Sequence, residues 1–177
     1  SHAAQWFPGV EAAAISQHWH VVVITKMGCP GLALPVTFDH DVAYPDCRAW
    51  QPAAIARLEA LHPTLVVMGD WRAKYDEEIG GHSVHITDER WTSAFTDIIS
   101  SLIAGGTHVL LPSDAPIART QVDQCLAAHP RAMNNCELPR ARSIDQHQVD
   151  LLRAIAQHTG AMFHDTSSWF CTDTVCP

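Results

Sequence analysis

The first residues of the chain, SHAAQWFP at positions 1–8, place a hydroxyl side chain directly before an apolar, helix-forming segment. In parallel α/β proteins, a nucleophilic serine commonly lies where a strand ends and a helix begins. Its backbone N–H then points into the site, and the helix N-terminus stabilises developing negative charge. Ser1 is therefore a candidate nucleophile, and the strand that leads to it would precede the given sequence. The alternative is that Ser1-His2 is a remnant of an expression tag.

A serine hydroxyl becomes a good nucleophile only when a neighbouring base accepts its proton, and that base needs an orienting partner. His2 follows Ser1 directly, but adjacent side chains on a helix diverge, so His2 is a poor base. His164-Asp165 follows the last predicted strand and is the best candidate within the chain. The alternative for this pair is a partly exposed histidine beside a turn-forming aspartate.

The pattern of histidines and cysteines does not predict a metal site. His82-x-x-His85 has a spacing that could bind a metal ion, but it lies in a glycine-rich loop without a third ligand. None of the cysteines has CxxC spacing, which argues against a zinc ribbon or a thioredoxin-type redox site.

The cysteines fall into three pairs of sequence neighbours that flank short loops. The simplest pairing gives the disulfides Cys29–Cys47, Cys125–Cys136 and Cys171–Cys176. Three structural disulfides, each contributing about 2–4 kcal/mol, would indicate an oxidising, extracytoplasmic compartment. Reduced thiols in the core are the alternative.

Length and charge narrow the class of protein. The 177 residues suffice for one domain with a substantial core, and 47% hydrophobic with 17% charged residues is ordinary for a globular protein. The formal net charge of −8 argues against a surface that binds nucleic acid or an anionic membrane. No apolar run approaches the roughly 18–20 residues needed to span a bilayer, and no signal peptide is visible.

Hydrophobic periodicity predicts helices and strands in alternation, with long loops after the strands. The predicted helices cover residues 3–18, 50–61, 91–103, 121–128 and 144–158, and the predicted strands cover 20–25, 64–68, 107–111 and 161–164. The polar segment 72–89 is predicted to be a long loop. This order favours a parallel sheet with helices on both faces.

In such a sheet, the ligand site lies outside the carboxyl ends of the strands. The segments that follow those ends are 27–29, 69–71, 112–114 and 165–166, and Ser1 would share their edge. The tryptophans at positions 6, 50, 71, 91 and 169 are interpreted as packing residues. Trp71 is also placed at the rim of the site, where aromatic rings often stack on sugars.

Several motifs along the chain are similar to those of one family. SHAAQWFP at 1–8 resembles the block after Gly-Asp in SGNH (GDSL-type) hydrolase domains fused to acyltransferase family 3 membrane proteins, where Gly-Asp-Ser-His contains the nucleophile. The other matching motifs are Cys29-Pro30, Cys47-Arg48, the strand at 63–68 followed by Trp71, Cys125-Leu126 with Cys136, Pro139-Arg140, and Trp169-Phe170-Cys171-Thr172 with Cys176-Pro177. The likeness spans nearly the whole chain and favours Ser1 as a native residue.

The resemblance implies one domain over residues 1–177, with a three-layer α/β/α architecture, a parallel (flavodoxin-like) sheet of the SGNH hydrolase type and no cofactor. Two parts of the family pattern lie outside the sequence: the Gly-Asp before Ser1 and an Asp-x-x-His motif expected after Cys176-Pro177. We therefore expect a catalytic domain truncated at both ends, whose isolated piece has little or no activity.

The resemblance also implies an oxyanion hole made by the serine N–H, a glycine and an asparagine. Gly28, after the strand at 20–25, is a candidate for the glycine, whereas the asparagine block here reads Gly-Asp-Trp-Arg at 69–72. An ionised Asp70 cannot donate a hydrogen bond, so backbone N–H groups, Trp71 Nε1 or Arg72 could serve instead. The candidate set is Ser1, Gly28, Asp70, Trp71 and Arg72.

The resemblance thus predicts an O-acyltransferase or esterase that moves an acyl group, most simply acetyl, to or from hydroxyls of cell-envelope carbohydrate through an acyl-serine. It implies a carbohydrate or glycolipid acceptor and a membrane acyltransferase domain on the same polypeptide. That domain would tether the site in the periplasm or at the outer face of the cell membrane. No nucleic-acid partner is expected.

One alternative to this function is a non-catalytic carbohydrate- or partner-binding domain. Another, an N-terminal nucleophile that uses its own α-amine, fits poorly with a helix directly after Ser1.

Overall fold

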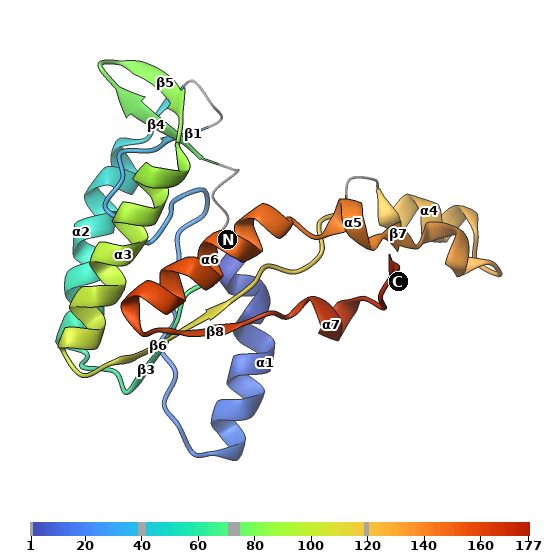
Figure 1. Ribbon diagram of the computed structural model, residues 1–177, viewed down its shortest axis with the longest axis horizontal. Coiled ribbons are helices and arrows are strands. Elements are labelled where there is room, and N and C mark those ends of the chain that lie inside the picture. Colours follow the sequence, from blue (N-terminus) through green and yellow to red (C-terminus); the bar gives the residue numbers. More distant parts are fainter. Residues whose placement is uncertain (1, 39–41, 71–74, 119–120) are drawn as a thin grey trace.

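The fold is built around a parallel sheet of three strands in a computed structural model that describes residues 2–38, 42–70, 75–118 and 121–177. The strands are β3 (Leu65–Val67), β6 (His108–Pro112) and β8 (Met162–His164). They pair in the order β3-β6-β8, with Val66 opposite Val109 and Leu111 opposite Phe163 (Figure 1). The predicted parallel α/β sheet is therefore confirmed.

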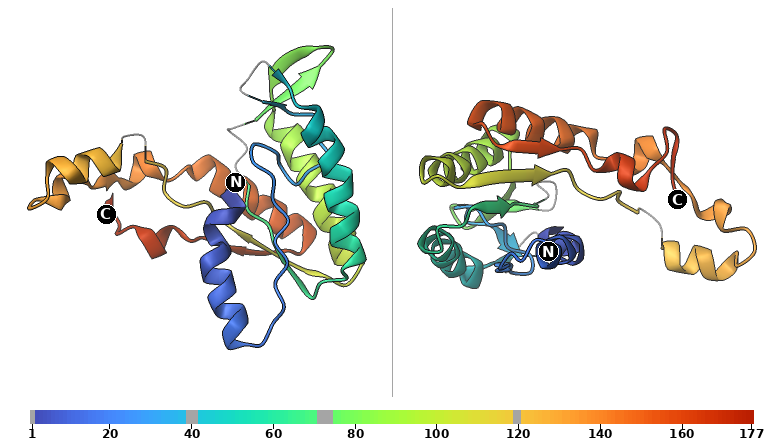
Figure 2. Two further views of the ribbon diagram at one scale, coloured as in Figure 1. Left: turned by 180° about the vertical axis from the view of Figure 1, so that it is seen from behind. Right: turned by 90° about the horizontal axis from the view of Figure 1, so that it is seen from below.

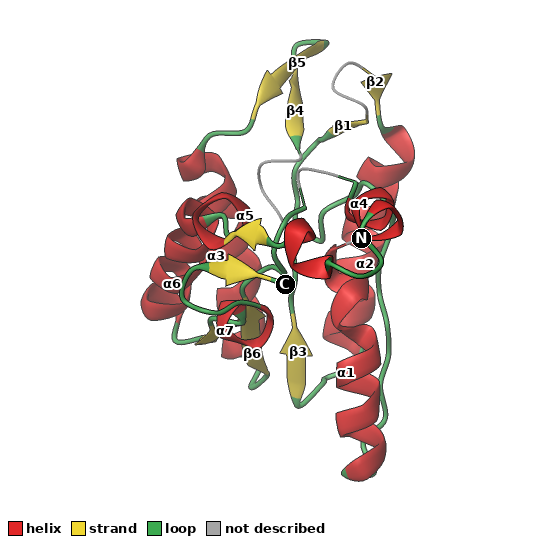
Figure 3. Ribbon diagram, turned by 90° about the vertical axis from the view of Figure 1, so that its right-hand side faces the viewer, coloured by secondary structure: helices red, strands yellow, loops and turns green. Residues whose placement is uncertain are grey.

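Helices cover both faces of this sheet, as a three-layer architecture requires. The four long helices are α1 (His2–Ser16), α2 (Pro45–Ala60), α3 (Asp88–Ala104) and α6 (Gln146–Thr159). Figure 3 shows α3 and α6 on one side of the strands and α1 and α2 on the other. Within the described residues, no helix combines the length and the apolar character needed to cross a bilayer.

The two helices on the α3–α6 side follow their sequence signals closely. Thr87 caps α3, because its side-chain oxygen accepts a hydrogen bond from the backbone N–H of Arg90 at 3.2 Å. Gly160 ends α6 in the left-handed region with φ of 81°, a conformation that favours glycine. The buried residues of α3 recur every three or four positions and face the sheet: Trp91, Ala94, Phe95, Ile98, Ile99 and Leu102.

An aromatic stack fills the core beside α3. Trp91 is fully buried, and its ring lies 5.9 Å from the ring of Tyr75 and 5.4 Å from the ring of Phe95 between centroids. These are ordinary distances for interacting aromatic pairs. The interpretation of Trp91 as a packing residue is confirmed.

The structure contains the three predicted disulfides, Cys29–Cys47, Cys125–Cys136 and Cys171–Cys176. The first is buried in the core, whereas the second closes an arm over residues 121–139 that extends away from the sheet (Figure 2). The short elements of the arm and of the C-terminal segment are α4 (Val122–Ala128), η2 (Met133–Cys136), β7 (Leu138–Pro139), α5 (Arg140–Ser143), α7 (Ser167–Phe170) and β9 (Val175–Cys176). Strands β7 and β9 pair and join the base of the arm to the C-terminal segment.

The prediction that residues 20–25 form a strand of the sheet is wrong. This segment makes no ladder with β3, β6 or β8, and a single bridge between Lys26 and Cys29 follows it. Val22 and Val23 are 44% and 49% exposed, so they are not covered on both faces. A run of β-branched residues marks a strand only where a neighbouring strand supplies hydrogen-bond partners.

The prediction of a loop at 72–89 is also wrong in part, because a hairpin occupies its middle. Strands β4 (Asp76–Ile79) and β5 (His82–His85) pair antiparallel around Gly80 and Gly81, whose φ values of 61° and 83° suit a tight hairpin turn. A second small hairpin joins β1 (Thr37–Phe38) to β2 (Val42–Ala43).

An ion pair between a buried glutamate and a half-exposed arginine connects the β4–β5 hairpin to α3. The carboxylate of Glu77 is almost fully buried and accepts hydrogen bonds from Nε and Nη2 of Arg90 at 2.8–3.2 Å. This bidentate pair compensates for removing the Glu77 charge from water. By contrast, the pair of Arg48 and Glu78 at 2.8 Å is more exposed.

We predict that Arg90→Met lowers the free energy of unfolding by about 2 kcal/mol, because it leaves the buried Glu77 carboxylate without its counter-ion. Arg48→Met is the matched control and should change the free energy by less than about 1 kcal/mol. Urea unfolding at pH 7 measures both values. Equal losses in the two variants would contradict the prediction.

Candidate active site at the carboxyl edge of the sheet

The first turn of α1 lies directly against the end of β3. A Cβ atom placed on Gly69 would lie 3.2 Å from Cδ1 of Trp6 and 3.3 Å from Cα of Ala3. These distances are tighter than ordinary van der Waals contact, so the close approach favours glycine at position 69. The helix that begins directly after Ser1 is thereby held at the carboxyl edge of the sheet.

A hydrogen bond fixes the same turn to the end of β6. The side-chain amide of Gln5 donates to Oδ1 of Asp114, and the same oxygen accepts from the backbone N–H of Ala115 at 3.0 Å. A carboxylate near a helix N-terminus is also favoured by the helix dipole. The first turn of α1 therefore contacts the residues that follow two neighbouring strands.

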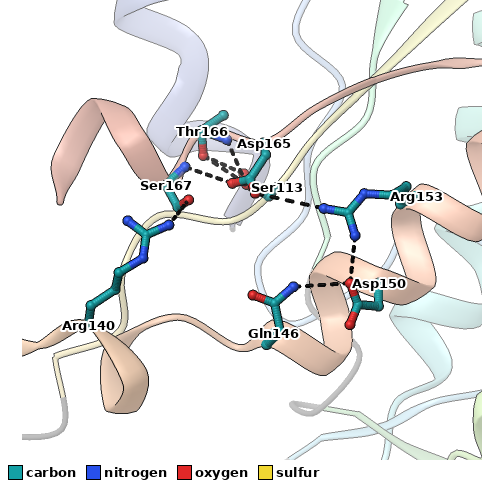
Figure 4. Close-up of polar contacts among 8 residues, drawn as sticks. All are labelled: Ser113, Arg140, Gln146, Asp150, Arg153, Asp165, Thr166 and Ser167. Atoms are coloured by element: carbon teal, nitrogen blue, oxygen red, sulfur yellow. Dashed lines mark hydrogen bonds and ion pairs between the residues drawn. The ribbon is translucent and has the colours of Figure 1, made fainter. Parts of the chain in front are cut away.

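A buried network joins the ends of β6 and β8 (Figure 4). Ser113 and Thr166 are both fully buried. The backbone N–H of Thr166 donates to Oγ of Ser113 at 2.9 Å, and Oγ1 of Thr166 donates to the carbonyl of Ser113 at 3.1 Å. The backbone N–H of Ser113 donates to the carbonyl of His164 at 2.9 Å. These bonds satisfy the buried polar groups and keep the two strand ends in register.

Asp165 lies at the rim of this network. Its Oδ1 accepts from the backbone N–H of Ser167 at 3.0 Å and from Oγ of Ser113 at 3.4 Å, and its Oδ2 lies 3.8 Å from Arg153 Nη2. Burial acts to raise the pKa of Asp165, but the hydrogen bonds from Ser167 and the charges of Arg153 and Arg140 outweigh it and lower the pKa. Asp165 is thus an anion held by its surroundings.

The pair His164-Asp165 does not form a histidine–aspartate dyad. The Asp165 carboxylate contacts Ser113, Ser167 and Arg153, while the exposed imidazole of His164 lies against the ring of Trp169, 4.7 Å away between centroids. A general base needs an orienting acceptor for its second ring nitrogen. This geometry argues against His164 as an internal base.

Of the expected oxyanion-hole residues, Gly28 and Asp70 lie within the described part of the chain. Ser1, Trp71 and Arg72 lie outside the described residues. Gly28 lies in a turn, with φ of 63°. It follows the segment 20–25, which is not part of the sheet.

Asp70 follows β3, and its environment is that of an anion rather than a donor. Burial, the Asp70 charge and a hydrogen bond to the Asp70 carboxylate together raise the pKa of Tyr75 far above its usual range. The Tyr75 hydroxyl therefore donates to Asp70. The backbone carbonyl of Asp70 also accepts from Nε2 of the buried Gln148 at 3.4 Å. The hydrogen bond from Tyr75 supports the argument that the Asp70 carboxylate does not donate to an oxyanion.

The two histidines of the candidate metal motif do not converge. Both lie on β5, three positions apart, and residues an odd number apart on a strand face opposite sides. His85 Nδ1 lies 3.2 Å from Oδ1 of Asp76. Elsewhere in the described part of the chain, Cys125, His129 and Cys136 offer ligand atoms close together, but both cysteines are in a disulfide and are not available as thiolate ligands.

Sequence reasoning missed the residues that assemble this edge. Gln5, Asp114 and Ser113 gave no recognisable motif, because their contacts join positions about 50 to 110 residues apart in the chain. The one available signal was that Ser113-Asp114 and Asp165-Thr166 each follow a predicted strand. That signal located the edge but could not indicate which side chains pair there.

We predict that Asp165→Asn lowers the free energy of unfolding at pH 7 and flattens its dependence on pH in the acid range. The folded-state pKa of Asp165 lies below its ordinary value of 3.8, so this stabilisation is fully present above that value. It is lost as the pH falls through the folded pKa. Thermal unfolding from pH 7 to pH 3 measures the effect. The same slope in the variant and the wild type would contradict the prediction.

Comparison with known proteins gives one structural neighbour. It is described as "Structure of Salmonella ser. Paratyphi A lipopolysaccharide acetyltransferase periplasmic domain". The match has a TM-score of 0.68 at 12% sequence identity and covers 99% of this chain and 66% of that one. This chain therefore spans just under two thirds of its neighbour, and at this identity the likeness concerns the fold. A search of curated proteins gave no match.

A comparison with protein families is more specific. The family described as "SGNH domain (fused to AT3 domains)" matches residues 1–177. The match covers the whole chain, and the parallel sheet flanked by helices is the fold of the structural neighbour. The chain belongs to the family of SGNH domains that are fused to AT3, or acyltransferase family 3, domains.

Proposed function

We propose that this domain is a serine O-acyltransferase or esterase that moves an acyl group, most simply acetyl, to or from hydroxyls of cell-envelope carbohydrate. The observation that carries the proposal is the position of α1. Its first turn, directly after Ser1, is held against Gly69 at the end of β3 and Asp114 at the end of β6. The family match and the lipopolysaccharide acetyltransferase domain among its structural relatives support the same reaction class.

In the proposed mechanism, Oγ of Ser1 attacks the carbonyl carbon of an acyl donor while a base accepts the hydroxyl proton. The carbonyl oxygen becomes an oxyanion, and collapse of the intermediate expels the donor group and leaves an acyl-serine. A sugar hydroxyl or water then attacks the acyl-serine and receives the acyl group. The N-terminus of α1 would favour the negative charge that develops in both steps.

The base is proposed to come from the Asp-x-x-His motif of the family. Within the chain, the exposed His164 ring lies against Trp169, and the Asp165 carboxylate is directed to Ser113, Ser167 and Arg153. The proposed oxyanion donors are the backbone N–H groups of Ser1 and Gly28, with Trp71 Nε1 or Arg72 as a third donor. Loss of one such donor typically lowers the rate by about 10²–10³-fold.

We further propose that the domain acts outside the cytoplasm, in the periplasm or at the outer face of the membrane. Its partner would be a membrane acyltransferase domain on the same polypeptide. The three disulfides support an oxidising compartment. The family description supports the membrane partner, which would supply the acyl group at this site.

We predict that a sulfonyl fluoride probe labels the full polypeptide at Ser1 and that Ser1→Ala abolishes both labelling and acetyl transfer. Ser16→Ala, at the last residue of the same helix, is the matched control and should retain both. Peptide mapping by mass spectrometry locates the label. Labelling that persists in Ser1→Ala would remove Ser1 as the nucleophile. A wild type that binds carbohydrate but neither takes the label nor transfers acetyl would be a non-catalytic binding domain.

A further inference from the structure

Four aromatic side chains from three elements gather at the carboxyl edge of the sheet: Trp6 of α1, His164 of β8, and Trp169 and Phe170 of α7. The ring of Trp6 lies 6.1 Å from that of Trp169, edge to face, and 6.0 Å from that of Phe170. The ring of Trp169 also lies 4.7 Å from that of His164. We call these four residues the aromatic cluster. Its rings hold one another in fixed positions.

Trp169 is one of three exposed members of the aromatic cluster, together with His164 and Phe170. Its exposure of 61% contrasts with the complete burial of Trp91 in the core, so the interpretation of Trp169 as a packing residue is wrong. An indole ring that is fixed by neighbouring rings and yet faces solvent offers a flat apolar surface at little further cost in side-chain entropy. Such surfaces commonly mark binding sites.

The aromatic cluster adjoins the candidate active site. Cδ1 of Trp6 would lie 3.2 Å from a Cβ atom at Gly69, which places Trp6 at the end of β3. His164 is the last residue of β8 and directly precedes Asp165. The exposed ring of Trp169, which contacts both residues, therefore lies near the strand ends that also hold the first turn of α1.

A hydrogen-bond donor, Arg140, contacts residues on both sides of Trp169 along the chain. Nη2 of Arg140 donates to Oγ of Ser167 at 2.7 Å, and Nη1 donates to the carbonyl of Thr172 at 3.2 Å. These two bonds use two of the five N–H groups of the guanidinium. Figure 4 shows Arg140 beside Ser167, with Asp165 close by. Hydrogen-bonding groups thus accompany a flat apolar surface within one short segment.

We propose that Trp169 is the floor of a subsite that binds a neutral pyranose ring of the acceptor by stacking. The inference rests on the proposed function only in taking the acceptor to be a carbohydrate. A pyranose has one face rich in C–H groups, which suits the electron-rich face of an indole. Its hydroxyls suit donors such as Arg140. The net charge of −8 disfavours an anionic lipid surface as the occupant.

The test measures binding of methyl α-glucopyranoside, methyl α-galactopyranoside and methyl α-mannopyranoside to the full polypeptide by saturation-transfer NMR. Trp169→Ala should raise the Kd of the best pyranoside about tenfold, and Trp169→Phe should recover part of the affinity. Trp19→Ala is the matched control, because Trp19 is equally exposed at 60% but follows the opposite end of α1. It should leave the Kd unchanged.

Three outcomes would overturn the proposal: no pyranoside binds, Trp169→Ala binds as the wild type does, or Trp19→Ala weakens binding to the same extent. Labelling at Ser1 separates this proposal from the proposed function. Normal labelling in Trp169→Ala with unchanged pyranoside affinity refutes the subsite alone. Trp169-dependent binding in a wild type that is not labelled refutes acyl transfer and leaves the subsite standing.

Discussion

The candidate site depends on one close approach between backbones. Gly69 follows the end of β3, and the first turn of α1 lies close to it. A Cβ atom on Gly69 would lie 3.3 Å from Cα of Ala3. Because a glycine occupies this position, the helix can lie against the sheet at its very first turn. The bond from Gln5 to Asp114 then fixes that turn to the next strand. The first turn of α1 takes its position from these two contacts.

Carboxylates held in hydrogen-bond networks surround the junction. Asp70 accepts from Tyr75, Asp114 accepts from Gln5, and the pKa of Asp165 is lowered by Ser167 and by two arginines, which together outweigh its burial. Carboxylates fixed in this way cannot donate hydrogen bonds. Their role is to hold the strand ends and the helix in place. The developing negative charge of acyl transfer would instead rely on backbone N–H groups and the helix N-terminus.

The α3 side of the sheet is consolidated by buried contacts that differ from those at the candidate site. The buried stack of Tyr75, Trp91 and Phe95 and the pair of Glu77 with Arg90 consolidate the α3 side. The aromatic cluster lies at the carboxyl edge instead, where Trp169 keeps most of its surface in solvent. The aromatic stack beside α3 and the aromatic cluster thus have similar distances between ring centroids but differ in their exposure to solvent. Exposure, and not ring contact, distinguishes the candidate binding surface from the core.

The sequence by itself determined the parallel α/β class, the greater part of the α3 and α6 helices, and the three disulfides, because these follow from local periodicity and from neighbours along the chain. It also located the edge of the sheet where Ser113, Asp114 and Asp165 lie. It was wrong about 20–25, because β-branched residues form a sheet strand only where a neighbouring strand pairs with them. It likewise interpreted Trp169 as a packing residue. Only the tertiary structure decided the contacts of Gln5 with Asp114, of Ser113 with Thr166 and of Trp6 with Trp169. These join residues that lie far apart in the chain, and the position of α1 at the strand ends and the pairing of β6 with β8 bring them together.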